Sequence, residues 1–304
     1  MAGNASRMKL GTAPISWGVC ELPDWGVMLP YQRVLDEMAD LGYVGTELGP
    51  WGYLPKDAAV LRKELRARGL ALAGAFCPVT LHHPLRYDEQ MAYAMDTCRL
   101  LADLGAPVLV LAEAGDAVRE RIAGRVRTSD PRFSEDQWKR FSEGANEIAR
   151  RAKEMGLVTA FHPHAGTYVE TPAETEELLR RTDPALVGLC LDTGHVYYGG
   201  GDPVALARND PGRIRHVHLK DVYSDRYERA LAQKLDFTAA VGEDVFAPVG
   251  FGAVDMALLL RILREARFDG WLIVEQDIRI APGSERQPKL DAAKSRSFIA
   301  SAIG

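Results

Sequence analysis

The stretch VGLCLD, residues 187–192, is a short apolar run that ends on an aspartate, and PVLVLA at residues 107–112 is a second apolar run. Runs that are apolar along most of their length, without alternation, are typical of parallel strands covered on both faces. The chain contains eight such runs. They predict strands over Leu10–Pro14, Val44–Leu48, Leu70–Phe76, Pro107–Ala112, Val158–His162, Val187–Asp192, Ile214–Leu219 and Trp271–Glu275.

Between these runs lie segments in which apolar residues recur at helical spacing. In the first of them, Val34, Leu35 and Met38 fall on one stripe that would face a core. The same reading predicts helices over Tyr31–Leu41, Lys56–Arg68, Asp88–Leu104, Ser134–Met155, Pro172–Arg181, Pro203–Ala207, Val254–Ala266 and Gln287–Ile303.

Eight strands that alternate with helices predict an α/β fold, the (β/α)₈ TIM barrel. No glycine-, serine- or proline-rich linker divides the chain, so we expect a single domain over residues 1–304, with residues 1–8 as a flexible N-terminal extension. The alternative, an open doubly wound sheet, would carry a glycine-rich phosphate-binding turn after an early strand. Neither GxGxxG nor GxxxxGK(S/T) occurs in the sequence.

Composition excludes several classes of protein. Hydrophobic residues make up 47% and charged residues 26% of the 304, which is ordinary for a globular enzyme and unlike a disordered chain. The net charge of −5 disfavours nucleic acid as a partner, and the apolar runs are too short to span a bilayer. No apolar stretch follows Met1–Lys9, and the four cysteines lie far apart, which favours reduced thiols in the cytoplasm. A homo-oligomer, dimer or tetramer, is left open.

Polar residues gather where the predicted strands end. In a TIM barrel the carboxyl ends of the strands and the loops after them build the active site. Five of the seven histidines lie on or just after the fifth, sixth and seventh strands. The polar side chains that we therefore expect around one mouth are Glu47, Glu113, His162, His164, Asp192, His195, His216, His218, Lys220, Asp221, Glu275 and Asp277.

These residue types indicate a metal. Buried charge of one sign is costly unless it is paired or bound to a cation, and Asp192 and Glu275 beside neutral imidazoles would be stabilised by a divalent ion. Mixed nitrogen and oxygen ligands suit Mn²⁺, Co²⁺, Zn²⁺ or Fe²⁺ better than Ca²⁺ or Mg²⁺. His216 and His218 share one face of a strand. We favour His218 as the ligand because it lies nearer the carboxyl end, with the deeper histidine orienting it.

The same residues carry a family resemblance. The motifs LDTGH (191–195), HVHLKD (216–221), PVGFG (248–252) and VEQD (274–277) resemble the xylose isomerase-like barrel superfamily, which includes sugar isomerases, ketose 3-epimerases, inosose dehydratases and the endonuclease IV branch. The segments GTAPISWG (11–18), TELGPWGYLP (46–55) and FHPHAGTYVETPAE (161–174) are most similar to the inosose (2-keto-myo-inositol) dehydratase group. The resemblance covers nearly the whole chain.

The resemblance implies a set of metal ligands. The superfamily typically holds its metal with Glu, Asp, His and Glu on strands 5 to 8, which correspond here to His162, Asp192, His218 and Glu275. The first position departs from the pattern, so His164 is an alternative ligand. The implied ion is Mn²⁺ or Co²⁺, with Zn²⁺, Fe²⁺ and Mg²⁺ as alternatives. Ketose 3-epimerases use two opposed glutamates as acid and base, and only Glu275 of that pair is present, which disfavours an epimerase.

The implied activity is a metal-dependent hydro-lyase that acts on a keto-cyclitol or keto-sugar, with a sugar isomerase or epimerase as the alternative. Three residues could remove the α-proton: Glu275, His195 or His164. Three could supply a proton to the leaving hydroxyl: Lys220, His195 or Glu47. The side chains expected to contact the keto-polyol are Glu47, Trp17, Trp51, His216, Asp277 and Glu113.

Other features allow two interpretations. His82 and His83 either join the pocket or lie at the surface. Gly115–Phe133 is predicted as a loop that forms a lid or anion site, or else a solvated or subunit-contacting face, and its guanidinium groups are Arg119, Arg121, Arg125, Arg127 and Arg132. Tyr223–Val249 is a second long connection that covers the mouth or contacts a partner subunit. An abasic-site endonuclease is disfavoured by the net charge, and a non-catalytic sugar-binding barrel by the intact ligand residues.

Overall fold

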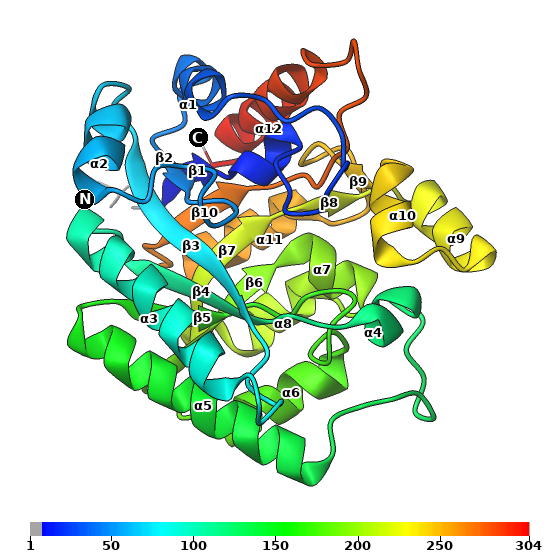
Figure 1. Cartoon of the computed structure of the whole chain (residues 1–304). Helices are drawn as coiled ribbons and strands as arrows, with labels where there is room; N and C mark the ends of the chain where they lie inside the picture. Colours follow the sequence, from blue (N-terminus) through cyan, green and yellow to red (C-terminus); the bar gives the residue numbers. More distant parts are fainter. Residues whose placement is uncertain (1–7, 304) are drawn as a thin grey trace.

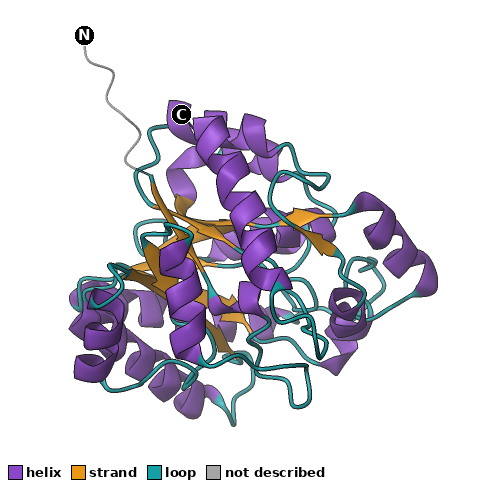
Figure 2. Ribbon diagram, turned by 90° about the horizontal axis from the view of Figure 1, so that it is seen from above, coloured by secondary structure: helices purple, strands orange, loops and turns teal. Residues whose placement is uncertain are grey.

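In a computed structural model, which describes residues 8–303, eight parallel strands close into a barrel that helices surround (Figures 1 and 2). All eight predicted strands are present, so the TIM barrel is confirmed. Their order around the barrel is β1-β10-β7-β6-β5-β4-β3-β2. Their bounds are β1 Lys9–Thr12, β2 Gly45–Glu47, β3 Ala71–Val79, β4 Val108–Glu113, β5 Val158–Phe161, β6 Val187–Asp192, β7 Ile214–Leu219 and β10 Trp271–Val274.

The eight predicted helices are also present, with ends that shift by a few residues. Val34, Leu35 and Met38 of the first helix are buried, as the stripe predicted. The helices of the outer ring are α1 Tyr31–Asp40, α2 Ala58–Arg66, α3 Tyr87–Leu104, α5 Glu135–Glu154, α6 Pro172–Arg181, α8 Pro203–Asn209, α11 Met256–Glu265 and α12 Gln287–Ile303. Capping boxes fix the starts of α5 and α6, where Ser134 and Thr171 each accept a hydrogen bond from the backbone three residues on.

Several elements were not predicted, and most of them are only two to six residues long. The two long connections contain α4 (Ala117–Arg121), α9 (Ser224–Gln233) and α10 (Phe237–Gly242). His195, expected at a turn, lies in α7 (Thr193–Tyr198), which starts where β6 ends and is capped by Asp192. The remaining short elements are the 3₁₀ turns η1 (Pro14–Trp17) and η2 (Pro211–Arg213) and a two-stranded antiparallel sheet of β8 (Asp221–Val222) and β9 (Phe246–Ala247).

The predicted N-terminal extension lies, except for Met8, outside the described residues. Within residues 8–303, every helix is too short or too polar to cross a membrane.

The barrel interior is apolar low down and polar at the carboxyl end. Trp271 and Ile273 of β10 pack with Ala73 of β3. Because side chains alternate along a strand, Glu275, which follows β10, points to the same face one step higher. On β7 the same alternation places His218 above His216. The polar residues that we expected at the mouth therefore lie above a layer of apolar side chains inside the barrel.

We expect Gly45→Ala to destabilise the barrel. A Cβ atom at Gly45 would lie 2.5 Å from the indole ring of Trp271 and 3.1 Å from the carbonyl oxygen of Ala71, and the buried ring has no room to move away. Overpacking of this kind costs about 1–3 kcal/mol. Urea denaturation measures it. Gly212→Ala is the matched control, because its Cβ would meet no described atom within 4 Å. Equal midpoints for the two variants would contradict this packing.

Candidate active site

A cavity of about 340 Å³ opens at the carboxyl end of the barrel. Its volume falls in the range of small-molecule sites. Most of the expected polar residues line it: Glu47, Glu113, His162, His164, His218, Lys220, Glu275 and Asp277. Asp192, His195 and His216 are outside that lining and are buried directly behind it.

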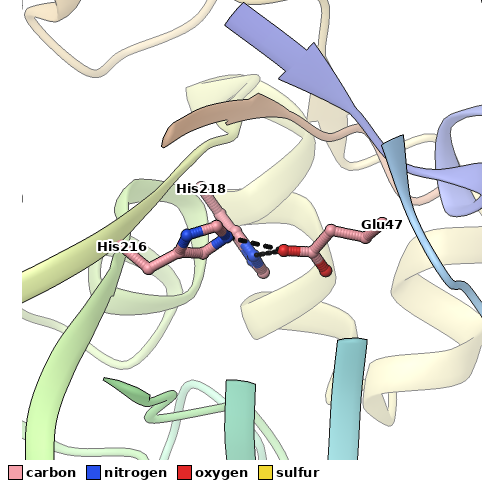
Figure 3. A group of neighbouring side chains, drawn as sticks. All are labelled: Glu47, His216 and His218. Atoms are coloured by element: carbon pink, nitrogen blue, oxygen red, sulfur yellow. Dashed lines mark hydrogen bonds and ion pairs between the residues drawn. The ribbon is translucent and has the colours of Figure 1, made fainter. Parts of the chain in front are cut away.

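Glu47, at the end of β2, holds two histidines of β7 (Figure 3). Its Oε1 atom lies 2.6 Å from Nε2 of His216 and 3.0 Å from Nε2 of His218. Burial alone would raise the pKa of Glu47, but the two imidazoles hold that pKa well below its usual range. Glu47 is therefore an ionised acceptor, so it is not suited to donate a proton. The ring of His216, for which we expected a substrate contact, is buried and paired with Glu47.

The hydrogen bond to Glu47 decides how His218 presents its other nitrogen. In the neutral ring Nε2–H donates to Glu47 and Nδ1 carries the lone pair that a metal would take. Nδ1 lies 3.3 Å from Oε2 of Glu275 and 3.5 Å from Oδ2 of Asp192. Burial lowers the pKa of His218, but the carboxylates of Glu275 and Glu47 raise it well above its usual value, so without a metal the ring holds a second proton. Neither Nδ1 of His218 nor Oδ2 of Asp192 has a hydrogen-bond partner among the described residues. Buried acceptors that point at one another need a cation or a proton between them.

His162 adds another donor to this group. Its Nδ1 lies 2.7 Å from the carbonyl oxygen of Pro163, which places the proton there and leaves a lone pair on Nε2. That Nε2 lies 3.3 Å from Oδ2 of Asp192. His162, Asp192 and His218 present three ligand atoms within 4.8 Å of one another. An ordered set of nitrogen and carboxylate donors, with imidazoles fixed by outer hydrogen bonds, fits a divalent metal.

Lys220 provides the positive charge beside this group. Its Nζ lies 2.8 Å from Asp277, 3.1 Å from Glu275 and 3.4 Å from Asp192. Burial would lower the pKa of Lys220, but the three carboxylates raise it above its usual value. The ammonium group therefore keeps its proton and acts as a fixed charge and hydrogen-bond donor.

His164 and His195 stack with ring centroids 3.8 Å apart. Burial, together with His162, lowers the pKa of His164 to about 3, so the ring is neutral. Nδ1 of His164 lies 2.8 Å from the carbonyl oxygen of Ala165, which leaves the lone pair of Nε2 for the cavity that this residue lines. Nδ1 of His195 accepts from the amide of Ala165, which places the ring proton on Nε2, 3.0 Å from Nζ of Lys220.

Two expected contacts are displaced from the cavity. Trp17 is fully buried in the core, and its indole donates a hydrogen bond to Glu37. Trp51 packs edge-on against Tyr93. Neither residue is part of the cavity lining within the described chain, so the structure does not bring them to the expected site. Of the two histidines after β3, His82 lies 3.5 Å from Glu113 and His83 is exposed.

The arginine-rich segment does not form an anion site in the cavity. Arg119 is fully buried, and its guanidinium forms a two-pronged ion pair with Glu174, with distances of 2.8 and 2.9 Å. None of the five guanidinium groups between residues 115 and 133, all within the described chain, lines the cavity. The lid or anion-site interpretation is therefore wrong for Arg119, which is a structural ion pair.

Sequence reasoning missed the apolar wall of the cavity. Ile15 and Val19 follow β1, Phe76 lies on β3, and Phe237 and Val241 lie on α10. The long connection Tyr223–Val249 was the available signal, and one of its two interpretations, that it covers the mouth, agrees with the position of α10. The spacing of apolar residues in this connection gave no indication of which side chains would line the cavity.

The fold and the site define a TIM barrel whose mouth holds an ordered group of imidazoles and carboxylates suited to a divalent ion. A family described as xylose isomerase-like TIM barrel matches residues 35–302, and the chain belongs to this family.

Known proteins similar to the chain include an inosose dehydratase of Clostridium beijerinckii, which is 34% identical over 99% of each chain. Among solved structures, the IOLI protein with a zinc atom superposes with a TM-score of 0.71 at 18% identity, covering 98% of this chain and 99% of that one. A D-psicose 3-epimerase of Clostridium cellulolyticum gives 0.71 at 15% identity, with 97% and 99% covered. The two structures show a shared fold.

We expect Glu47→Gln to weaken the binding of divalent metal. An amide has no negative charge to hold both Nε2–H groups, so His218 would lose the orientation of Nδ1. Loss of such an outer partner typically lowers metal affinity about 10–100-fold. Competition with a chromophoric chelator measures it. Glu21→Gln is the control, because Glu21 is an exposed carboxylate of the same cavity. Unchanged affinity in Glu47→Gln would show that Glu47 does not orient a ligand.

Proposed function

We propose that the protein is a divalent-metal-dependent hydro-lyase that removes water from a keto-cyclitol, and specifically an inosose (2-keto-myo-inositol) dehydratase. The observation that carries the proposal is the convergence of His218 Nδ1 with the carboxylates of Asp192 and Glu275, at 3.5 and 3.3 Å. Relatives that carry the name inosose dehydratase, at 34% identity over almost the full length, support the choice of reaction.

The residues that would hold the metal are His162, Asp192, His218 and Glu275. His162 is preferred over His164 because its Nε2 lies 3.3 Å from Oδ2 of Asp192. Mn²⁺ or Co²⁺ suits mixed nitrogen and oxygen ligands. When bound, the cation supplies Lewis-acid stabilisation of the negative charge that forms on the substrate oxygen.

The side chains around the metal group then have separate tasks. Glu275 is ionised, because His218 and Lys220 lower its pKa against the effect of burial, and it accepts the α-proton. Lys220 donates a hydrogen bond to a substrate oxygen while it remains charged. Asp277, 2.8 Å from Lys220, accepts from a substrate hydroxyl. Nε2 of His195 lies 3.0 Å from Nζ of Lys220.

An epimerase is the less favoured candidate. A reaction that removes a proton from one face of a sugar and returns it to the other uses two opposed carboxylates at the reacting carbon. At the strand-5 position this chain has His162, whose free nitrogen is directed at Asp192. A dehydratase needs only one base at the reacting carbon.

We expect purified protein loaded with Mn²⁺ or Co²⁺ to convert 2-keto-myo-inositol to a conjugated product that absorbs in the near ultraviolet. Chelation should abolish the conversion, because it removes the cation that stabilises the negative charge on the substrate oxygen. Added metal should restore it. Mass spectrometry in D₂O distinguishes the alternative. Deuterium uptake without loss of water would favour an epimerase, and turnover that survives metal removal would refute the metal requirement.

A further inference from the structure

One wall of the cavity is built from three aromatic rings that are partly exposed. Phe76 lies on β3, His164 follows β5, and Phe237 is the first residue of α10. The ring of His164 lies next to both of the others, with its centroid 5.9 Å from that of Phe76 and 5.5 Å from that of Phe237. All three residues line the cavity. A ring-shaped polyol would therefore meet mostly carbon on this wall.

His164 places a hydrogen-bonding nitrogen in this wall. Its Nδ1 lies 2.8 Å from the carbonyl oxygen of Ala165, so the ring proton is there and Nε2 carries a lone pair. Nε2 makes no hydrogen bond within residues 8–303 and, unlike Nδ1 of His216 or of His218, it is not sealed inside the protein. Because His164 is partly exposed and lines the cavity, this nitrogen is open to a ligand.

The ring of His164 is also fixed in position. It stacks on His195 at 3.8 Å, and Nδ1 of His195 accepts from the amide of Ala165 at 3.1 Å, so both histidines are tied to the same residue. Thr167 donates its hydroxyl hydrogen to the carbonyl oxygen of His164 at 2.8 Å and so fixes the turn after β5. A fixed acceptor in an apolar wall discriminates between substrate orientations, because a hydroxyl pressed against the rings loses water without gaining a partner.

His164 and Glu275 lie at opposite ends of the candidate metal group. The ligands of that group follow β5, β6, β7 and β10, which are consecutive in the barrel, so His162 is at one end and Glu275 at the other. The ring of His164 lies beside that of His162, with centroids 5.3 Å apart. A substrate whose keto group sits at the metal group would thus extend towards Glu275 on one side and towards His164 on the other.

The orientation of the ring decides which product forms from a symmetric keto-cyclitol. In 2-keto-myo-inositol a mirror plane passes through the carbonyl carbon and the carbon opposite it, so the two α-carbons are mirror images of each other. Loss of water through one α-carbon gives one enantiomer of the product, and loss through the other gives its mirror image. To make one enantiomer, an enzyme needs a contact away from the base that decides which α-carbon the base meets.

We propose that His164 makes this choice. Its Nε2 accepts a hydrogen bond from a substrate hydroxyl on the side of the ring away from Glu275, while Phe76 and Phe237 cover the neighbouring C–H groups. This role rests on the proposed function. No proton is transferred through His164, which is a specificity-determining residue and not the base. Wild-type protein should therefore form a single enantiomer of the product.

The test compares His164→Phe with His164→Gln in the metal-loaded protein. Phenylalanine keeps an aromatic ring in the wall but removes the acceptor, so kcat/KM for 2-keto-myo-inositol should fall about 10–100-fold. Chiral chromatography should then detect both enantiomers of the product. Glutamine returns an acceptor oxygen close to the place of Nε2 but cannot take up a proton at neutral pH, and it should restore mostly one enantiomer. The affinity for divalent metal, measured by chelator competition, should match that of wild type in both variants.

His83→Phe is the matched control. It makes the same change at an exposed histidine that follows β3 and lies outside the cavity lining of the described chain. This variant should keep its rate and its single enantiomer. If His164→Phe does not fold, His164→Gln and the wild-type protein decide, since a mixture of enantiomers from the wild type would overturn the role.

Three results from the variants would also overturn it. The first is a single enantiomer from His164→Phe at an undiminished rate. The second is a large loss of metal affinity in His164→Phe, which would make the residue a metal ligand. The third is loss of α-proton exchange with D₂O in His164→Gln, which would make it the base.

Failure of the proposed function has a different signature. Wild-type protein that leaves 2-keto-myo-inositol unchanged would refute the proposed function and this role with it. Wild-type protein that dehydrates the substrate to both enantiomers would refute the role of His164 alone.

Discussion

Glu47 binds two imidazoles of one strand through a single carboxylate oxygen, and the polarity of the barrel mouth depends on this contact. It directs Nδ1 of His218 towards the carboxylates of Asp192 and Glu275, two buried negative charges that need positive charge beside them. Lys220 supplies part of that charge and a divalent ion would supply the rest. The gathering of buried carboxylates around His218 thus suits the site to a cation.

The order of the strands around the barrel brings the residues of the candidate metal site together. β5, β6, β7 and β10 are consecutive in the barrel, so their carboxyl ends bring the four proposed ligands together. Asp192 and His218 are direct partners in register, and the amide of Glu275 continues the ladder to Leu219. β4, which ends on Glu113, lies across the barrel from β10.

The sequence was sufficient for the barrel because eight apolar runs and eight helical stripes are long enough to show their periods. It also predicted most of the mouth, since residues at strand ends must converge in this fold. Prediction from the sequence failed for residues whose positions are set by tertiary contacts and not by the local pattern. Trp17 is drawn into the core by its hydrogen bond to Glu37, and Arg119 is buried because Glu174 lies within reach. Partners that are distant in sequence leave no local signal.

The same buried arginine bears on the kind of substrate. Because the guanidinium groups of the arginine-rich segment lie outside the cavity lining of the described chain, Lys220 is the one lysine or arginine in that lining, and three carboxylates already neutralise it. Sites for phosphorylated sugars rely on unpaired cations at the phosphate. Phe237 and Val241 of α10 instead close the mouth with apolar surface. The walls thus favour an uncharged keto-polyol held by the metal group and by hydrogen bonds, which agrees with a cyclitol ring and disfavours a sugar phosphate.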